Sequence, residues 1–250
     1  MQIVIDGRLL NYSEINPKGK TDLIILHGWA HTGALWQNLA QKLSVNIHSL
    51  LIDLPAFGSS QALTGNPNVP DYTQTIVDFI KKLGLKKPII LGHSFGGQIA
   101  LDLAVKHPSL VKSLILVSPA GVRFRSKKTK AKLLVINSLK PLKKLIPSKY
   151  TKKFIHRFIS RDYAAANPEQ KIVFSNIVKY DLSGKFASIK TPCHLIWGSE
   201  DREISYSAKL ITESIPDCRL YVLYNAGHNP HLTHTEKLAQ MINQALNSHA

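Results

Sequence analysis

Two hydrophobic patterns alternate along most of the chain. Short runs are apolar at nearly every position, as in Leu23–Leu26, and each is followed by a stretch in which apolar residues recur every three or four positions. The runs predict buried strands and the stretches predict amphipathic helices. Because the strands are apolar on both faces and helices separate them, the pattern favours a mainly parallel sheet covered by helices on both sides.

The expected elements follow from this alternation. We expect strands at residues 22–27, 47–54, 89–91, 113–117, 192–197 and 219–223, and helices near residues 33–43, 71–83, 98–104, 205–215 and 231–246. Residues 2–14 alternate apolar and polar positions around Asp6-Gly7, which predicts a hairpin of two further strands. The predicted fold class is therefore α/β, with a mostly parallel eight-stranded sheet flanked by helices.

The alternation stops between residues 122 and 186. This segment contains no convincing strand, only short helical stretches separated by Pro141, Pro147 and Pro168. The strand and helix pattern resumes after it, so we expect a helical cap, residues 122–186, inserted into one core made of residues 1–121 and 187–250. A chain of 250 residues can form such a core without disulfide or metal support.

Charge separates the expected cap from the core. Residues 122–186 hold 17 Lys and Arg against 3 Asp and Glu, whereas the rest of the chain holds 15 basic and 13 acidic residues. Basic and apolar residues alternate there, which predicts basic amphipathic helices. Three interpretations stay open: solvated lysines on a lid, attraction to an anionic membrane surface, or an anionic substrate. Nucleic acid is disfavoured because aromatic residues are few and no binding motif occurs.

Other features narrow the class of protein. Cys193 and Cys218 lie in apolar runs and are expected to be small buried residues, which fits a reducing compartment. No leader peptide and no apolar run of ~18 residues is visible, so we expect a soluble, cytoplasmic protein. The sequence has no Cys/His spacing for zinc and no phosphate-binding loop, so neither a metal nor a cofactor is expected.

A serine between two glycines lies where a predicted strand meets a predicted helix. The stretch is Gly92-His93-Ser94-Phe95-Gly96. A serine nucleophile on a tight strand-to-helix turn requires this context, and side chains two residues on either side of it would collide. The turn would expose the Ser94 hydroxyl and aim the backbone N–H of Phe95 at the group under attack.

A serine nucleophile needs a base and a group that orients the base. His228 follows the last predicted strand and Asp201 follows the strand before it. In an open α/β sheet these loops lie at the same edge as Ser94, at the carboxyl ends of the strands. Glu200 is an alternative acid, but Asp201 occupies the deeper loop position.

The chain has 11 histidines, so a single histidine proves little. We expect His93 to point away from the serine, His107 to end a helix, and His231 and His234 to lie at the surface. His228 therefore remains the preferred base.

Acyl transfer also needs two fixed donors for the oxyanion. The N–H of Phe95 is one of them. The second is expected from Trp29 in His27-Gly28-Trp29, where Gly28 would let the backbone turn so that the N–H of Trp29 faces the site.

These motifs together resemble the α/β-hydrolase family, in the branch of esterases, carboxylic-ester lipases and C–C bond hydrolases. The matching stretches are His27-Gly28-Trp29, Asp53-Leu54-Pro55-Ala56-Phe57-Gly58-Ser59-Ser60, Gly92–Gly97, Trp197–Asp201 and Gly227-His228, which span nearly the whole chain outside the cap. Ala30 and Ala56 stand where the family usually has glycine, and these conservative losses of backbone freedom put little of the resemblance in doubt. The serine argues against the members that use aspartate as nucleophile.

The resemblance implies the α/β-hydrolase fold and a reaction. Ser94, deprotonated by His228, would attack an ester carbonyl while Asp201 holds the imidazole. The N–H groups of Trp29 and Phe95 would bind the oxyanion, and water would hydrolyse the acyl-enzyme. Three functions stay open: an esterase acting on a small-molecule ester with an apolar acyl group, a C–C bond hydrolase with the same triad, and a cationic membrane- or nucleic-acid-associated binding protein whose triad is vestigial.

Overall fold

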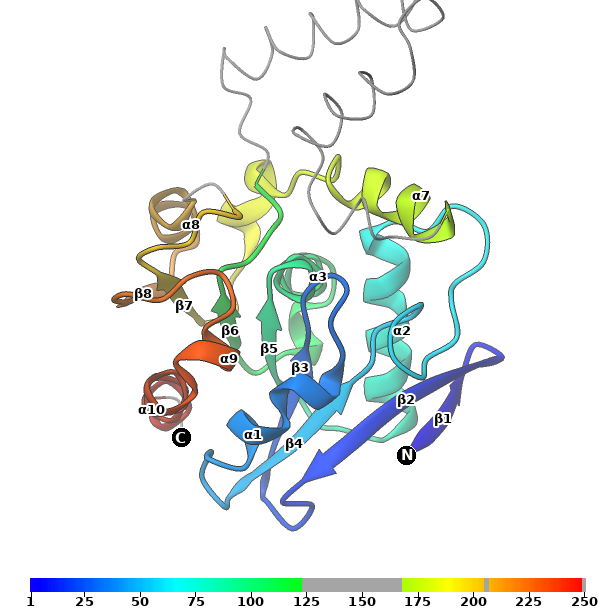
Figure 1. Ribbon diagram of the computed structural model, residues 1–250, viewed down its shortest axis with the longest axis horizontal. Coiled ribbons are helices and arrows are strands. Elements are labelled where there is room, and N and C mark those ends of the chain that lie inside the picture. Colours follow the sequence, from blue (N-terminus) through cyan, green and yellow to red (C-terminus); the bar gives the residue numbers. More distant parts are fainter. Residues whose placement is uncertain (123–167, 205–206, 249–250) are drawn as a thin grey trace, which may run out of the picture.

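An eight-stranded sheet forms the centre of the computed structural model, which describes residues 1–122, 168–204 and 207–248. The strands are β1 (Gln2–Ile5), β2 (Arg8–Ile15), β3 (Thr21–Leu26), β4 (Ile47–Ile52), β5 (Ile89–His93), β6 (Leu114–Val117), β7 (Cys193–Gly198) and β8 (Cys218–Leu223). Their order in the sheet is β1-β2-β4-β3-β5-β6-β7-β8. The pairs β1–β2 and β2–β4 are antiparallel and all other pairs are parallel, so the predicted fold class is confirmed (Figure 1).

Helices cover both faces of this sheet. They are η1 (Gly33–Trp36), α1 (Gln37–Ala40), α2 (Val69–Lys82), α3 (Phe95–Lys106), η2 (Pro108–Leu110), α7 (Pro168–Ile177), η4 (Ser183–Ser188), α8 (Ala208–Ser214), α9 (Pro230–Thr233) and α10 (Thr235–Asn247). The start of α2 shows how sequence sets a boundary. Asn68 caps the helix by accepting from the N–H of Val69, and the Asp71 carboxylate accepts from the N–H of Asn68.

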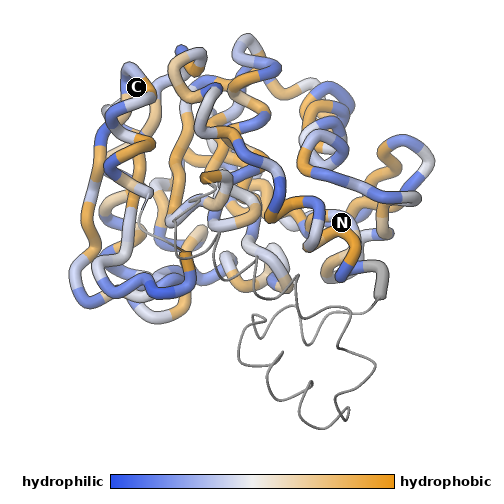
Figure 2. The backbone as a smooth tube through the Cα atoms, turned by 90° about the horizontal axis from the view of Figure 1, so that it is seen from above, coloured by the Kyte–Doolittle hydropathy of each residue, from blue (hydrophilic) through white to orange (hydrophobic). Residues whose placement is uncertain are grey.

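The core consists of two apolar layers, one on each face of the sheet. Strand residues alternate between them: Ile90 packs into the layer with α2, α3 and α8, whereas Ile89 and Leu91 pack into the layer with α1 and α10. Because both faces are covered, the central strands are buried at almost every position. Figure 2 shows this as mainly hydrophobic strands between helices of mixed hydropathy.

Two helices differ from the sequence-based expectation. The helix expected at residues 33–43 is a 3-10 turn followed by a helix that ends at Ala40. Its start is fixed because the N–H of Gly33 donates to the Asp53 carboxylate at 2.8 Å. The C-terminal helix is interrupted at His234, whose φ of −135° separates α9 from α10.

The helix α7 lies inside the predicted cap, near the carboxyl ends of the strands and over α2 (Figure 1). Two amides fasten its end to the core. The side-chain amide of Gln98 donates to the carbonyl oxygens of Ile177 and Tyr180 at 3.0 and 2.8 Å. The side-chain amide of Asn176 donates to the carbonyl oxygen of Pro67 at 3.1 Å. Residues 123–167, which make up most of the predicted cap, lie outside the described residues.

Within the described ranges, no helix combines the length and the apolar content that crossing a bilayer would require.

Candidate active site

The turn that carries Ser94 has the conformation expected of an exposed nucleophile. Ser94 joins β5 to α3 with φ of 51° and ψ of −113°, a region that costs a non-glycine residue on the order of 1–3 kcal/mol. Its backbone is held on both sides: its N–H donates to the carbonyl of Val117 at 3.1 Å, and its carbonyl accepts from the N–H of Ala120 at 2.9 Å. The surrounding strands therefore impose the strained turn.

The glycines near Ser94 are required by close backbone approach. A Cβ on Gly92 would lie 2.5 Å from the carbonyl oxygen of Gly96, and a Cβ on Gly96 would collide with the carbonyl of Leu26. The predicted reason for these glycines is thus confirmed. Gly28 is required for a different reason than expected: its φ is not positive, and a Cβ there would lie 2.7 Å from Nδ1 of His93.

Asp201 and His228 meet across the loops that follow β7 and β8. Nδ1 of His228 lies 2.8 Å from Oδ2 of Asp201. The other carboxylate oxygen of Asp201 accepts from the N–H groups of Glu203 and Ile204 at 3.0 and 3.2 Å. Burial favours the neutral acid, but the hydrogen bond and the nearby charge of His228 outweigh it and hold the pKa of Asp201 below its ordinary value. Glu200, the alternative acid, is exposed.

The nucleophile's turn is connected to this pair through His93. His93 is 1% exposed and its Nε2 lies 2.8 Å from the carbonyl oxygen of His228. Because a carbonyl oxygen only accepts, Nε2 carries the hydrogen. The residue next to Ser94 therefore holds the loop of His228, a contact that the sequence pattern did not predict.

Two backbone N–H groups near Ser94 are available as donors. Within the described part of the chain, neither the N–H of Trp29 nor that of Phe95 has a hydrogen-bond acceptor. The loop of Trp29 is tied to the elbow because the N–H of Gly96 donates to the carbonyl of His27 at 3.1 Å. Unused buried donors are rare in folded proteins, so this pair suits an anionic ligand.

His27 fixes the loop that follows β3. Its Nδ1 lies 2.7 Å from the carbonyl oxygen of Gly28, so Nδ1 donates, and its Nε2 accepts from the N–H of Leu54 at 2.9 Å. Burial lowers the pKa of His27 to about 4, with smaller opposing effects from that carbonyl and from Asp53. A neutral imidazole of one tautomer therefore links the loops after β3 and β4.

A cluster of histidine rings and one tryptophan, the histidine cluster, gathers around His93. It comprises His31, His93, His228, His231 and Trp36. The ring of His231 stacks on Trp36 with centroids 4.4 Å apart, and His231 is 2% exposed. The prediction that His231 lies at the surface is therefore wrong, because the short helix α9 turns its ring inward. Burial lowers the pKa of His231 to about 3, helped by the neighbouring histidines.

An aromatic cluster lies at the other side of Ser94. It comprises Trp29, Phe57, Phe95 and Phe174, and the ring of Trp29 meets the other three edge-on with centroid distances of 5.0, 5.9 and 5.1 Å respectively. Phe174 belongs to α7, so the predicted cap segment contacts the residue expected to supply an oxyanion donor. Neither Phe57 nor Phe174 was a predicted site residue, since their proximity depends on tertiary packing.

The two alanines that replace family glycines are strained. Ala30 has φ of 57° and Ala56 has φ of 72°, in the left-handed region that favours glycine. An alanine in this region costs about 1–2 kcal/mol, so the loss of backbone freedom at these two positions has an energetic cost. Both alanines adjoin the aromatic cluster, next to Trp29 and Phe57.

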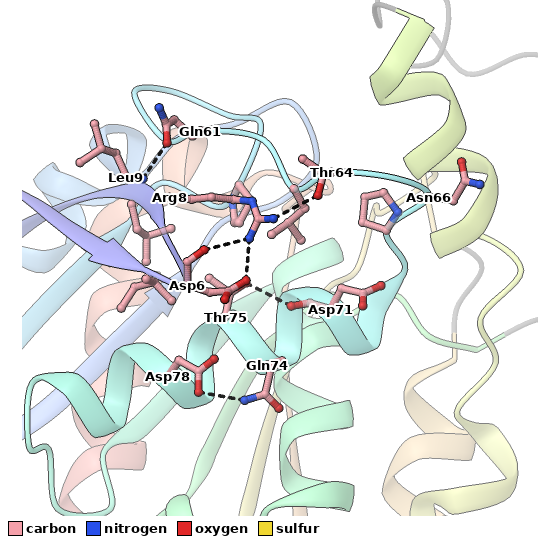
Figure 3. A pocket seen from close by; sticks show the side chains of 15 residues that line it. Asp6, Arg8, Leu9, Gln61, Thr64, Asn66, Asp71, Gln74, Thr75 and Asp78 are labelled. Atoms are coloured by element: carbon pink, nitrogen blue, oxygen red, sulfur yellow. Dashed lines mark hydrogen bonds and ion pairs between the residues drawn. The ribbon is translucent and has the colours of Figure 1, made fainter.

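A pocket of about 300 Å³ lies elsewhere, between the β1–β2 hairpin and α2, and none of the predicted site residues lines it (Figure 3). Arg8 at its centre is paired with Asp6 at 2.7 Å and bonded to Thr64 at 3.0 Å. The described residues contain no group of three His, Cys, Asp or Glu side chains that could hold a metal ion.

Comparison with known proteins agrees with this geometry. Residues 23–241 match the family model described as the alpha/beta hydrolase family. The chain belongs to this family. The alpha/beta hydrolase is 27% identical over 253 residues to the monoacylglycerol lipase ABHD6 of Homo sapiens, covering 90% of this chain and 75% of the relative.

Two further relatives of this alpha/beta hydrolase differ in their named activities. A 2-hydroxy-6-oxononadienedioate/2-hydroxy-6-oxononatrienedioate hydrolase of a Pseudomonas species is 24% identical over 266 residues, covering 96% of this chain and 93% of the relative. The crystal structure of a membrane phospholipase A, described as a bacterial virulence factor, matches with a TM-score of 0.81 and 23% identity, covering 100% of this chain and 86% of the other. The second match shows a shared fold.

Proposed function

We propose that this alpha/beta hydrolase is a serine hydrolase that cleaves carboxylic esters through an acyl-enzyme on Ser94. One observation carries the proposal. The strained turn of Ser94 lies beside a loop in which His228 is hydrogen-bonded to Asp201. Backbone strain persists where the surrounding structure imposes it, and it clusters at catalytic positions.

The protonation state of His228 suits a general base. Because the ionised carboxylate of Asp201 only accepts, Nδ1 of His228 carries a hydrogen, and in the neutral imidazole this tautomer leaves a lone pair on Nε2. In the proposed reaction, this lone pair takes the proton of the Ser94 hydroxyl as Oγ attacks the ester carbonyl. Asp201 stays ionised and stabilises the imidazolium that forms.

The N–H groups of Trp29 and Phe95 supply the proposed oxyanion hole. Each would donate to the oxygen that becomes negative when Ser94 attacks, and losing one such donor costs on the order of 3 kcal/mol of barrier. The alcohol then leaves with the proton from His228. Water, activated by the same histidine, hydrolyses the acyl-enzyme and restores Ser94.

The aromatic cluster supports an apolar acyl group. Trp29 and Phe95 present rings as well as N–H donors, and Phe174 adds a ring from α7. A monoacylglycerol lipase among the relatives is named for a substrate of this kind. Attraction of the basic cap segment to an anionic membrane surface stays a prediction, because residues 123–167 lie outside the described residues.

A C–C bond hydrolase is the second candidate. The Pseudomonas relative, which is matched over nearly its full length, is named as a hydrolase of 2-hydroxy-6-oxononadienedioate and 2-hydroxy-6-oxononatrienedioate. The same serine, base and oxyanion donors would serve both reactions, so the residues near Ser94 alone do not separate them.

The test uses p-nitrophenyl esters of increasing acyl length and a vinylogous diketone acid. We expect ester hydrolysis that favours longer acyl chains and falls by on the order of 10³-fold or more in Ser94→Ala. The matched control is His107→Gln, at the far end of α3. Wild-type activity in Ser94→Ala would contradict the catalytic assignment. Turnover of the diketone alone would favour the second candidate, and no turnover of either would favour a binding protein.

A further inference from the structure

His93 stands next to Ser94 but has no part in the proposed reaction steps. It is the last residue of β5, fully enclosed, and its Nε2–H donates to the carbonyl of His228 at 2.8 Å. Burial holds the pKa of His93 well below its ordinary value, and the neighbouring histidines add to this, so the ring is neutral at pH 7. A neutral ring with a fixed tautomer is a permanent donor.

The ring of His93 has no freedom to turn away from His228. His31 stacks on it with an interplanar angle of 13°, and the rings of His231 and Trp36 lie 4.9 and 5.8 Å from it between centroids. Gly28 lies against Nδ1, since a Cβ there would come within 2.7 Å of that atom. The packing therefore fixes the direction of the Nε2–H bond.

The backbone of His228 has little other support. Its loop is anchored as far as Ala226, whose carbonyl accepts from the N–H of Glu200 at 2.9 Å, and Gly227 follows with open space where a side chain would lie. Within the described part of the chain, His93 makes the only hydrogen bond to the backbone of His228. Asp201 is bonded to the imidazole of His228, whereas His93 is bonded to the backbone of His228.

The unused nitrogen of His93 points to the same role. Nδ1 is buried and has no hydrogen-bond partner among the described residues, and an unpaired buried polar atom costs about 1–3 kcal/mol. An apolar ring at this position would avoid that cost and still pack against Trp36 and His231. The hydrogen bond from Nε2–H to the carbonyl of His228 is the interaction of His93 that an apolar ring could not replace.

From these contacts we infer that His93 is a positioning residue that holds His228 at the correct distance from Ser94. The inference rests on the proposed function of Ser94 and His228. It couples the nucleophile to its base through the last residue of β5, which adjoins Ser94 in the chain and bonds to the backbone of His228.

The test measures covalent labelling of Ser94 by a fluorophosphonate, which requires no knowledge of the natural substrate. His93→Gln keeps an N–H donor near the place of Nε2, His93→Phe keeps the ring volume without a donor, and His93→Asn carries an amide too short to reach His228. We expect His93→Phe and His93→Asn to lower the maximal labelling rate at least 10-fold with unchanged half-saturating probe concentration. His93→Gln should stay within 3-fold of the wild type. His107→Gln is the matched control, and its labelling rate should not change.

Several outcomes would overturn the inference. One is labelling of His93→Phe or His93→Asn at the wild-type rate. Another is a rate for His93→Gln as low as that of His93→Phe at equal Tm. If His93→Phe fails to fold, the contrast between Gln and Asn decides the question. A wild-type protein that is not labelled at Ser94 would remove the proposed function and this inference together, which distinguishes that failure from the others.

Discussion

The two sides of Ser94 are built by different forces. On the histidine side, directed hydrogen bonds hold the loop of His228, from His228 to Asp201 and from His93 to the carbonyl of His228, in addition to ring packing. The aromatic cluster is held by edge-on ring packing around Trp29. Both clusters are largely buried, so the two sides differ in the kind of contact and not in the extent of burial.

The difference matches what each side is proposed to do. A proton-transfer group must be placed to within a fraction of an ångström, and hydrogen bonds with fixed donors and acceptors supply that accuracy. A surface for an apolar acyl group needs shape and apolar area instead. The aromatic side also reaches α7, a described part of the predicted cap segment, through Phe174.

The largest effect that we expect on the histidine side comes from the substitution Asp201→Asn. An amide at this position would leave His228 in the wrong tautomer, because Asn can donate where the carboxylate only accepts. We expect kcat for the preferred ester to fall ~10⁴-fold, with little change in KM. Equal falls in Glu200→Gln, an exposed neighbour, would contradict the assignment of Asp201 as the orienting acid.

Acid should destabilise the fold through buried histidines on both sides, namely His231 in the histidine cluster and His27 beside Phe57 of the aromatic cluster. The folded protein keeps His27 and His231 neutral, with pKa values near 4 and 3, whereas both take up protons near pH 6.5 when unfolded. The unfolded state therefore binds more protons below pH 6.5, and stability falls as the pH is lowered from 6.5 toward 4. The loss should be about 2 kcal/mol per histidine by pH 5.

Urea unfolding at pH 7 and at pH 5 measures this loss. His231→Phe keeps a ring against Trp36 but removes one titrating group, so its stability should depend less on pH than that of the wild type. His234→Phe, at a half-buried position outside the histidine cluster, is the control. A wild-type free energy of unfolding that does not change between these pH values would show that the buried histidines are protonated as readily as free ones.

Phe174→Ala addresses the aromatic side. Removing this ring takes away one of the three edge-on contacts of Trp29 and part of the proposed acyl surface. We expect kcat/KM to fall ~10-fold for long-chain esters, since an aromatic pair and its buried area contribute about 1–2 kcal/mol. Short-chain esters should be affected less. Ile172→Ala, at an exposed position on the same helix, is the control and should leave both rates unchanged.

Residues in local sequence motifs could be predicted from the sequence, whereas residues brought near Ser94 by tertiary packing could not. Ser94, Asp201 and His228 each lie in a short motif at the end of a predicted strand, so the topology alone brings them to one edge of the sheet. Their pairing in space was predicted, and their catalytic roles stay predictions. His231 and Phe174 carry no local signal, because their burial depends on how α9 and α7 turn relative to the sheet. The strain at Ala30 was likewise hidden, since it depends on backbone angles.

The smallest expected effect concerns that strain. Ala30→Gly and Ala56→Gly each relieve a left-handed alanine, which costs about 1–2 kcal/mol, but glycine also gives the unfolded chain about 0.4–1 kcal/mol of extra entropy. The net result should be a gain of about 0.5–1 kcal/mol per site in the free energy of unfolding in urea. On the histidine side, Asn225 has φ of 60°, but asparagine tolerates this region, so Asn225→Gly should gain less. If all three substitutions gave the same change, the strain would not be particular to the aromatic side. If the two alanine sites gain stability while ester hydrolysis slows, the alanines hold the loops of Trp29 and Phe57 in place at the expense of stability.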